Sequence, residues 1–154
     1  VRSFLSAGVD TTIDSIGLCL RALAEHPEQG KILQEDPSLA RAAFEEATRY
    51  DSSSQSLFRT TTEAFEFQGP KLDRHQKVLV LIGSAGRDPA VWEEPDRFDI
   101  RRRITHQIGY GTGIHGCVAQ IMARLEGEVF FRTLAEKFGR LEMTQDATLR
   151  LTPG

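Results

Sequence analysis

Tyr110-Gly111-Thr112-Gly113-Ile114-His115-Gly116-Cys117 is the stretch on which the interpretation of this chain depends. It is a glycine-rich loop that ends on a cysteine and leads into a segment with the periodicity of an amphipathic helix. A thiolate beside the N-terminus of a helix is stabilised by the helix dipole and makes a good metal ligand. A cysteine buried only for packing is the alternative, because cysteine is among the most buried residue types. The loop alone leaves both interpretations open.

The same loop has the spacing G-x-G-x-x-G, at Gly111, Gly113 and Gly116, which is the fingerprint of a dinucleotide-binding turn. That fingerprint opens a domain in which further strand–helix units must follow. Glu142 follows a possible next strand, and it already lies close to the end of the 154-residue sequence. The remaining length therefore argues against a dinucleotide-binding domain.

Composition places the chain among ordinary globular proteins, with 40% hydrophobic and 27% charged residues. The net charge of −3 does not predict a nucleic-acid partner. The longest apolar run, from Val78 to Ile82, is too short to span a bilayer, so no membrane association is expected. Two cysteines, Cys19 and Cys117, form no disulfide framework, so we expect a reducing compartment, the cytoplasm.

Hydrophobic periodicity predicts mainly helices with small β-sheets. Helices are expected from about Val1 to Glu25, from Glu28 to Gln34, and from Asp36-Pro37 to near Tyr50. The pattern begins at Val1 without a capping residue, so we expect upstream sequence to be missing.

The rest of the chain is expected to hold short strands and one long helix. The final helix is predicted over Cys117–Phe138, with its apolar face made of Val118, Ile121, Met122, Leu125 and Val129. Residues 83–106 are predicted to form a loop. The predicted strands are Leu57–Thr62, Ala64–Phe67, a buried strand at Lys77–Ile82, and a terminal hairpin of Leu141–Met143 with Leu149–Leu151.

The segment Ala7-Gly8-Val9-Asp10-Thr11-Thr12 interrupts the first predicted helix with poor helix formers. Glycine costs about 1 kcal/mol in a helix interior, and threonine hydroxyls compete for backbone carbonyls. Such distortions often mark functional sites, so we predict one here. A polar helix face with an incidental glycine is the alternative.

Two further signals are weaker on their own. Glu46 and Arg49 are spaced to share a helix face and pair, which usually happens at the surface. Arg59, at the start of a strand, could clamp a carboxylate with two parallel hydrogen bonds or be a surface arginine.

Together, and in this order, these segments resemble the motifs of the cytochrome P450 family. The loop resembles the haem-ligand motif F-G-x-G-x-H-x-C-x-G, with Tyr110 for phenylalanine and Ala119 for the last glycine. The first helix resembles A/G-G-x-D/E-T, and Glu46 to Arg49 resembles E-x-x-R. Residues 85–89 resemble A-N-R-D-P, with Gly86 for asparagine, and residues 96–98 resemble the meander. The chain is identified as the C-terminal part of a soluble, bacterial-type member, one partial domain over residues 1–154.

The resemblance implies a haem-thiolate monooxygenase that inserts one oxygen atom of O2 into a small organic substrate. Its cofactor would be haem b, iron protoporphyrin IX. The implied roles are Cys117 as axial iron ligand, Asp10 and Thr11 as proton relay, Gly8 and Gly111 as room for the macrocycle, Arg59 and His115 as propionate anchors, and Glu46, Arg49 and Arg97 as an internal ion network.

The resemblance also implies partners. Electrons would come from a ferredoxin-type donor and ultimately from NAD(P)H, and residues 101–103, three arginines, could help dock it or be a solvated charge run. Residues 58–62 are similar to those of members acting on small aromatic acids. The implied substrate pocket holds Ser6, Ala7, Ser53, Ser54, Gln55, Ser56 and Leu57.

Whole family members are more than twice as long, so a second hypothesis stands beside the first. The chain could be a catalytically incompetent fragment or remnant that does not bind haem alone. A haem-carrying module is a third hypothesis, since it would need Cys117 but neither Asp10 nor Thr11.

Overall fold

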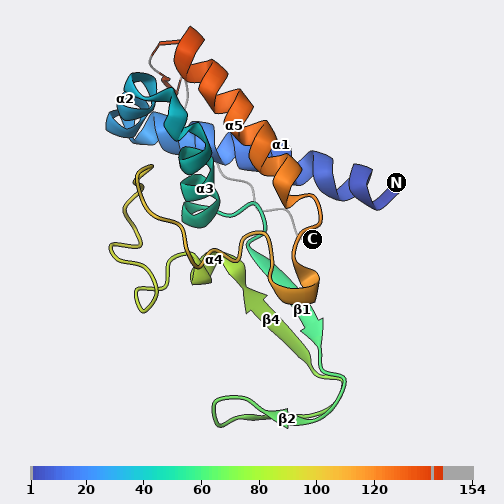
Figure 1. Cartoon of the computed structure of the whole chain (residues 1–154). Helices are drawn as coiled ribbons and strands as arrows, with labels where there is room; N and C mark the ends of the chain where they lie inside the picture. The colour runs from blue at the N-terminus through green and yellow to red at the C-terminus, as the bar shows by residue number, and fades with distance from the viewer. Residues whose placement is uncertain (1, 140, 144–154) are drawn as a thin grey trace.

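The computed structural model describes the backbone of residues 2–139 and 141–143, with side chains from residue 7 onward. Helices form the body of the molecule, and a narrow β-ribbon extends from it (Figure 1). This mainly helical fold with small sheets confirms the predicted class. The helices are α1 (Arg2–Glu25), α2 (Pro27–Glu35), α3 (Ala40–Tyr50), α4 (Ile82–Ala85) and α5 (Gln120–Lys137), with short 3-10 turns η1 (Pro37–Leu39) and η2 (Gly113–His115).

The first helix boundaries follow from the residues that stand at them. Pro27 occupies the first turn of α2, where its missing N–H leaves no partner unsatisfied, and α1 ends just before it. The Asp36 carboxylate accepts a hydrogen bond from the backbone N–H of Ser38 at 3.1 Å and so caps η1. These boundaries confirm the helices predicted in the first third of the sequence.

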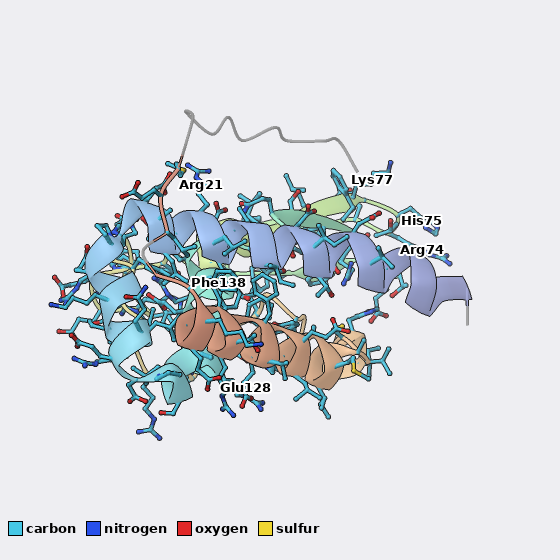
Figure 2. All side chains as sticks on the ribbon, turned by 90° about the horizontal axis from the view of Figure 1, so that it is seen from above. Arg21, Arg74, His75, Lys77, Glu128 and Phe138 are labelled. Carbon is cyan, nitrogen blue, oxygen red and sulfur yellow. The ribbon has the colours of Figure 1, made fainter. Side chains whose placement is uncertain are left out.

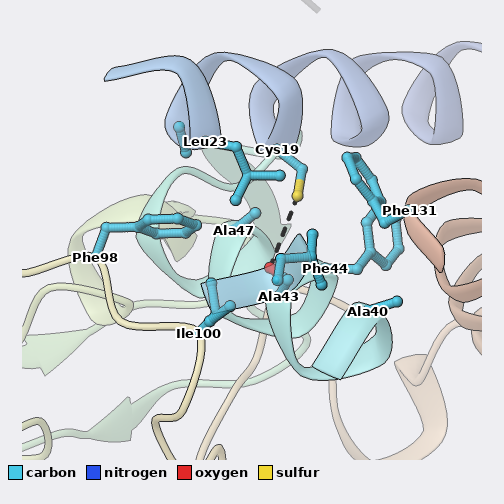
Figure 3. Close-up of a cluster of buried hydrophobic side chains, with 11 residues drawn as sticks. Cys19, Leu23, Ala40, Ala43, Phe44, Ala47, Phe98, Ile100 and Phe131 are labelled. Atoms are coloured by element: carbon cyan, nitrogen blue, oxygen red, sulfur yellow. Dashed lines mark hydrogen bonds between the residues drawn. The ribbon is translucent and has the colours of Figure 1, made fainter. Parts of the chain in front are cut away.

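The core lies where α3 packs against the two long helices, α1 and α5, which lie side by side when the molecule is seen from above (Figure 2). Phe44 of α3 meets Phe131 of α5 with ring centroids 6.1 Å apart. This approach depends on Gly127, because a Cβ there would lie 2.4 Å from the Phe44 ring. Figure 3 shows the buried cluster, which consists of Cys19, Ala22, Leu23, Leu33, Ala40, Ala43, Phe44, Ala47, Phe98, Ile100 and Phe131.

The ribbon is built from two antiparallel pairs of strands. β1 (Ser56–Thr60) pairs with β4 (Lys77–Leu81), and β2 (Phe65–Glu66) pairs with β3 (Lys71–Leu72). The prediction of a buried strand at residues 77–82 is wrong, because β4 alternates between exposed and half-buried residues. In the described chain β4 has only β1 beside it, and a two-stranded ribbon buries little of either face.

The final helix differs from its prediction in its start and in the face that it buries. α5 begins at Gln120, so Cys117 lies in the loop before it. Its buried residues are Gly127 and Phe131, on the opposite side of the helix from the predicted apolar face. The residues of that predicted face are all exposed: Val118, Ile121, Met122, Leu125 and Val129. Of the predicted terminal hairpin, residues 141–143 form no strand and residues 149–151 lie outside the described residues.

A fully buried ion pair ties α3 to the long loop that follows α4. Arg49 donates to both carboxylate oxygens of Glu46, from Nε at 2.7 Å and from Nη2 at 2.9 Å. Arg49 also donates to loop carbonyls, namely those of Gly86, Pro95 and Arg97. The pair predicted from the i, i+3 spacing is therefore an internal one.

The third member of this network is Arg102, whereas the family resemblance assigned that role to Arg97. Arg102 Nε lies 3.2 Å from Glu46 Oε1. The Arg97 side chain is exposed and pairs with Glu94, so Arg97 joins the network only through its carbonyl. Phe98 and Ile100, which lie between these two arginines, are buried in the core, and the backbone N–H of Asp99 donates to Glu46 Oε1 at 2.9 Å.

Candidate functional site

The loop that carries Cys117 is held by its own backbone. The N–H of Cys117 donates to the carbonyl of Tyr110 at 2.7 Å and closes the turn. Gly111 (φ +71°) and Gly113 (φ +59°) adopt the left-handed conformation that residues with a side chain rarely take. A Cβ on Gly111 would lie 2.5 Å from the carbonyl oxygen of His115. The glycines therefore allow a compact turn that presents Cys117 at its end.

Tyr110 anchors this loop to the helices behind it. The Arg124 guanidinium of α5 lies over the Tyr110 ring, 4.2 Å from its centroid, and also pairs with Glu45 of α3. Burial raises the pKa of Tyr110 from 10.0 to about 12, so the phenol keeps its proton at alkaline pH values at which an exposed tyrosine loses it. Arg124 could not be identified from the sequence, because its role depends on contacts between three separate segments.

The α1 segment around Thr11 is an unbroken helix, where the sequence predicted a distortion. The Thr11 hydroxyl donates to the carbonyl of Ala7 at 2.7 Å, which is the backbone contact expected of a threonine in a helix. No described atom lies within 4 Å of a Cβ built on Gly8, so Gly8 borders open space. This part of α1 thus has the Thr11 hydroxyl and the open space beside Gly8 on one helix face.

The α1 segment and the cysteine loop line one hollow of about 390 Å³. The loop after α3 lines it as well, although these three segments are far apart in the sequence. The predicted site residues that the structure brings together here are Ala7, Gly8, Thr11, Ser53, Ser54, Leu57, Gly111, His115 and Cys117.

Other predicted site residues lie away from this hollow in the described chain. Asp10 is exposed on α1, and Ser56 is exposed on β1. Arg59 is also exposed, and its Nη1 donates to the carbonyl of Phe58. Gln55 donates to the Asp51 carboxylate and the Ser52 carbonyl. The side chain of Ser6 lies outside the described residues.

Ser15 lines the hollow and was not identified from the sequence. Its hydroxyl donates to the carbonyl of Thr11 at 2.7 Å and lies 3.1 Å from the Ser53 hydroxyl. Ser15 therefore connects the Thr11 turn of α1 to the loop after α3. Its spacing of four residues from Thr11, which places both on one helix face, is the signal that could have revealed it.

The donor set of the hollow suits a metal held by a single protein ligand. Among the described residues no three His, Cys, Asp or Glu side chains gather in a way that could hold a bare metal ion. The residues that line the hollow include one thiol, that of Cys117, together with a glycine and several hydroxyls, and a haem iron can be held by one axial thiolate.

A family model described as Cytochrome P450 matches residues 1–152. This chain belongs to the cytochrome P450 family. Cytochrome p450 CYP199A2 of Rhodopseudomonas palustris is 49% identical over 143 residues, which are 93% of this chain and 35% of that protein. The 6-deoxyerythronolide B hydroxylase of Saccharopolyspora erythraea is 36% identical over 143 residues, with the same two coverages. The structure of CYP109Q5 from Chondromyces apiculatus superposes with a TM-score of 0.86 at 39% identity, over 90% of this chain and 36% of that one.

These comparisons confirm the predicted family and fold. The P450 relatives are monooxygenases that use haem and receive electrons from redox partners. This chain spans about a third of their length and is therefore a fragment of the P450 fold. In the described part of the P450 chain, no helix is long and apolar enough to cross a membrane.

Proposed function

We propose that this chain supplies the thiolate ligand and the oxygen-activating helix of a haem monooxygenase. A single observation carries the proposal: one hollow has Gly8 and Thr11 of α1 on its wall together with Cys117 of the glycine-rich loop. Residues 1–154 are then one partial P450 domain, which corresponds to about a third of the length of its relatives.

The residues around the hollow fit a haem. Cys117 would hold the iron, and Gly8 leaves open space on the facing helix. The turn at Gly111 lets the backbone approach a flat ring closely. His115 would donate to a propionate from the wall of the hollow, whereas Arg59 would first have to leave the Phe58 carbonyl. When bound, haem supplies the iron that activates O2 with two electrons, so that one oxygen atom enters the substrate and the other leaves as water.

Thr11 and Asp10 would deliver the protons that this reaction needs. The Thr11 hydroxyl donates to the Ala7 carbonyl, so its orientation is fixed and its lone pairs remain available to accept a proton. Asp10 precedes Thr11 on α1 and is exposed, so it can exchange protons with solvent. Ser15 holds the carbonyl of Thr11 and would keep this turn in place.

The walls of the hollow favour a small substrate with both polar and apolar parts. Ser53 and Ser54 supply hydroxyls, and Leu57 supplies an apolar surface. A small aromatic acid has this chemistry. Electrons would come from a ferredoxin-type donor and ultimately from NAD(P)H. Arg101 and Arg103 are exposed and could meet an acidic donor, while Arg102 is engaged with Glu46.

The test is haem uptake by the purified chain, followed by reduction and exposure to carbon monoxide. Thiolate ligation predicts a Soret band at the long-wavelength position of thiolate-bound ferrous haem. Cys117→Ala should abolish that band, and the matched variant Cys19→Ala should retain it. If turnover occurs, Thr11→Ala should increase the O2 consumed per product formed, and unchanged coupling would contradict the relay.

The second candidate is a catalytically incompetent fragment that does not bind haem alone. It is favoured because the chain covers only 35% of the length of CYP199A2. Folded protein that takes up no haem would support this candidate and reject thiolate ligation in the isolated chain. A haem complex without the shifted band would reject Cys117 as the ligand.

A further inference from the structure

Arg124 of α5 contacts three segments of the chain at once. Its Nε donates to the Glu45 carboxylate of α3, and its Nη1 donates to the side-chain oxygen of Gln120, the first residue of α5. Its guanidinium also lies over the Tyr110 ring, 4.2 Å from the centroid. Tyr110 is the first residue of the glycine-rich segment 110–117, which we call the Cys117 loop. One planar guanidinium therefore joins two helices to the start of this loop.

These contacts are partly shielded from water. The Arg124 and Glu45 side chains are only 20% and 14% exposed. Both an ion pair and a cation over an aromatic ring are stronger where water is partly excluded. In the orientation that suits both of its polar atoms, the Gln107 amide donates to Glu45 Oε2 at 3.1 Å. Residues 107 and 110, which lead into the Cys117 loop, are thus attached to the same ion pair.

The Cys117 loop is costly to hold in one conformation. Its glycines lose more conformational freedom on folding than other residues, and the Ala119 side chain forms no capping bond at the start of α5. Two backbone hydrogen bonds close the loop, from Gly111 N–H to the Ile108 carbonyl at 2.8 Å and from Cys117 N–H to the carbonyl of Tyr110. A contact that fixes Tyr110 therefore favours the closed loop.

We propose that Arg124 is the positioning residue of the Cys117 loop. By holding the Tyr110 ring against α3 and α5, it keeps the loop closed and the Cys117 thiol at the wall of the hollow. The use of that thiol as an iron ligand rests on the proposed function, whereas the closing of the loop by Arg124 does not require haem.

Hydrogen exchange of the Gly111 and Cys117 amides in the haem-free chain tests this role, because their bonds close the loop. Arg124→Gln should speed exchange at both amides about tenfold, and the amides of α1 should keep their rates. Arg124→Lys keeps the charge but loses the planar fork, so it should restore only part of the protection. Arg132→Gln is the matched control, since Arg132 lies on the same helix and pairs with Glu128.

A double-mutant cycle tests whether Arg124 acts through Tyr110. Tyr110→Leu removes the ring, so in that background Arg124→Gln should change loop exchange less than about twofold. Tyr110→Phe keeps the ring and should retain the full effect of Arg124→Gln. In chain loaded with haem, Arg124→Gln should lower the fraction of the carbon monoxide complex with the thiolate band, and Arg124→Lys should recover part of it.

Three outcomes would overturn the proposal. One is loop exchange that does not respond to Arg124→Gln. Another is an equal effect of Arg124→Gln with and without the Tyr110 ring. The third is an equal rise in exchange at the amides of α1, which would make Arg124 a contributor to overall stability alone. Circular dichroism checks that each variant folds. Because exchange is measured without haem, a failure of Cys117 to bind iron would leave this test intact, so the two proposals fail separately.

Discussion

Cys19 and Cys117 are the same side chain in two opposite environments. Cys19 is a fully buried residue of α1 that points toward α3, with its sulfur 3.8 Å from the Ala43 carbonyl (Figure 3). Burial raises the pKa of its thiol, since a thiolate there would lose its hydration. Cys117 is half-buried in the wall of a hollow. Packing therefore accounts for Cys19, and it does not account for Cys117.

This difference predicts how the two thiols react. In the native protein a thiol-labelling reagent should modify Cys117, whereas Cys19 should react only when the protein unfolds, because a buried, protonated thiol is inert. Mass spectrometry of peptides after short and long labelling measures both sites. Cys117→Ala should remove the fast phase. Labelling of Cys19 at the same rate as Cys117 in folded protein would contradict the buried position.

The ion network predicts a large difference between two neighbouring arginines. Arg102→Leu should lower the free energy of unfolding by about 3 kcal/mol, because it leaves the buried Glu46 carboxylate short of a partner. Arg97→Ala should change it by less than about 0.5 kcal/mol, since it removes only an exposed side chain and keeps the carbonyl. Urea denaturation measures both. Equal effects of the two substitutions would reject Arg102 as the third member.

At the scale of the elements, the ends of helices could be predicted from the sequence. Which segments pack against each helix face could not. Pro27 and Asp36 act on adjacent residues, so the ends of the first helices were predictable. The apolar stripe of α5 was predicted as well, but periodicity does not say what covers a stripe. The family resemblance assigned the third position of the ion network to Arg97, whereas in the structure Arg102 pairs with Glu46 and Arg97 pairs with Glu94.

Two helical glycines, Gly127 at the contact of α5 with α3 and Gly17 on α1, should respond in opposite ways to replacement by alanine. Gly127→Ala should destabilise the fold by about 1–3 kcal/mol, because its Cβ would lie 2.4 Å from the buried Phe44 ring. Gly17→Ala should stabilise it by about 0.5–1 kcal/mol, because no described atom lies within 4 Å and alanine favours a helix. Thermal unfolding measures both. A stabilising Gly127→Ala would mean that the helices are further apart than described.

At the scale of the whole molecule, the candidate site is made by tertiary contacts. Thr11 and Cys117 are separated by most of the chain and meet at one hollow. The sequence placed them there only through family resemblance, because no local pattern brings α1 to the cysteine loop. Ser15 and Arg124 belong to no family motif, and their contacts with Ser53 and with the Tyr110 ring are seen only in the structure.

The Cys19 thiol and the Tyr110 phenol predict how the stability of the protein depends on pH. The pKa of Cys19 is raised well above its ordinary 9.0, and that of Tyr110 is raised from 10.0 to about 12, both by burial. Above pH 9 the folded state therefore holds protons that the unfolded chain has released. The stabilisation from these groups is complete below pH 9; it is lost as the pH rises above 9 for Cys19 and between pH 10 and about 12 for Tyr110. The free energy of unfolding should fall by up to about 1.4 kcal/mol per pH unit for each group.

Variants separate the two contributions. Tyr110→Phe should flatten the decline between pH 10 and about 12, and Cys19→Ala should flatten it from pH 9 upward. Urea denaturation at a series of pH values gives the slopes. Loss of packing lowers the whole curve without changing its slope, so the slope isolates the proton linkage. Curves that stay parallel to the wild type would show that neither group is held protonated by the fold.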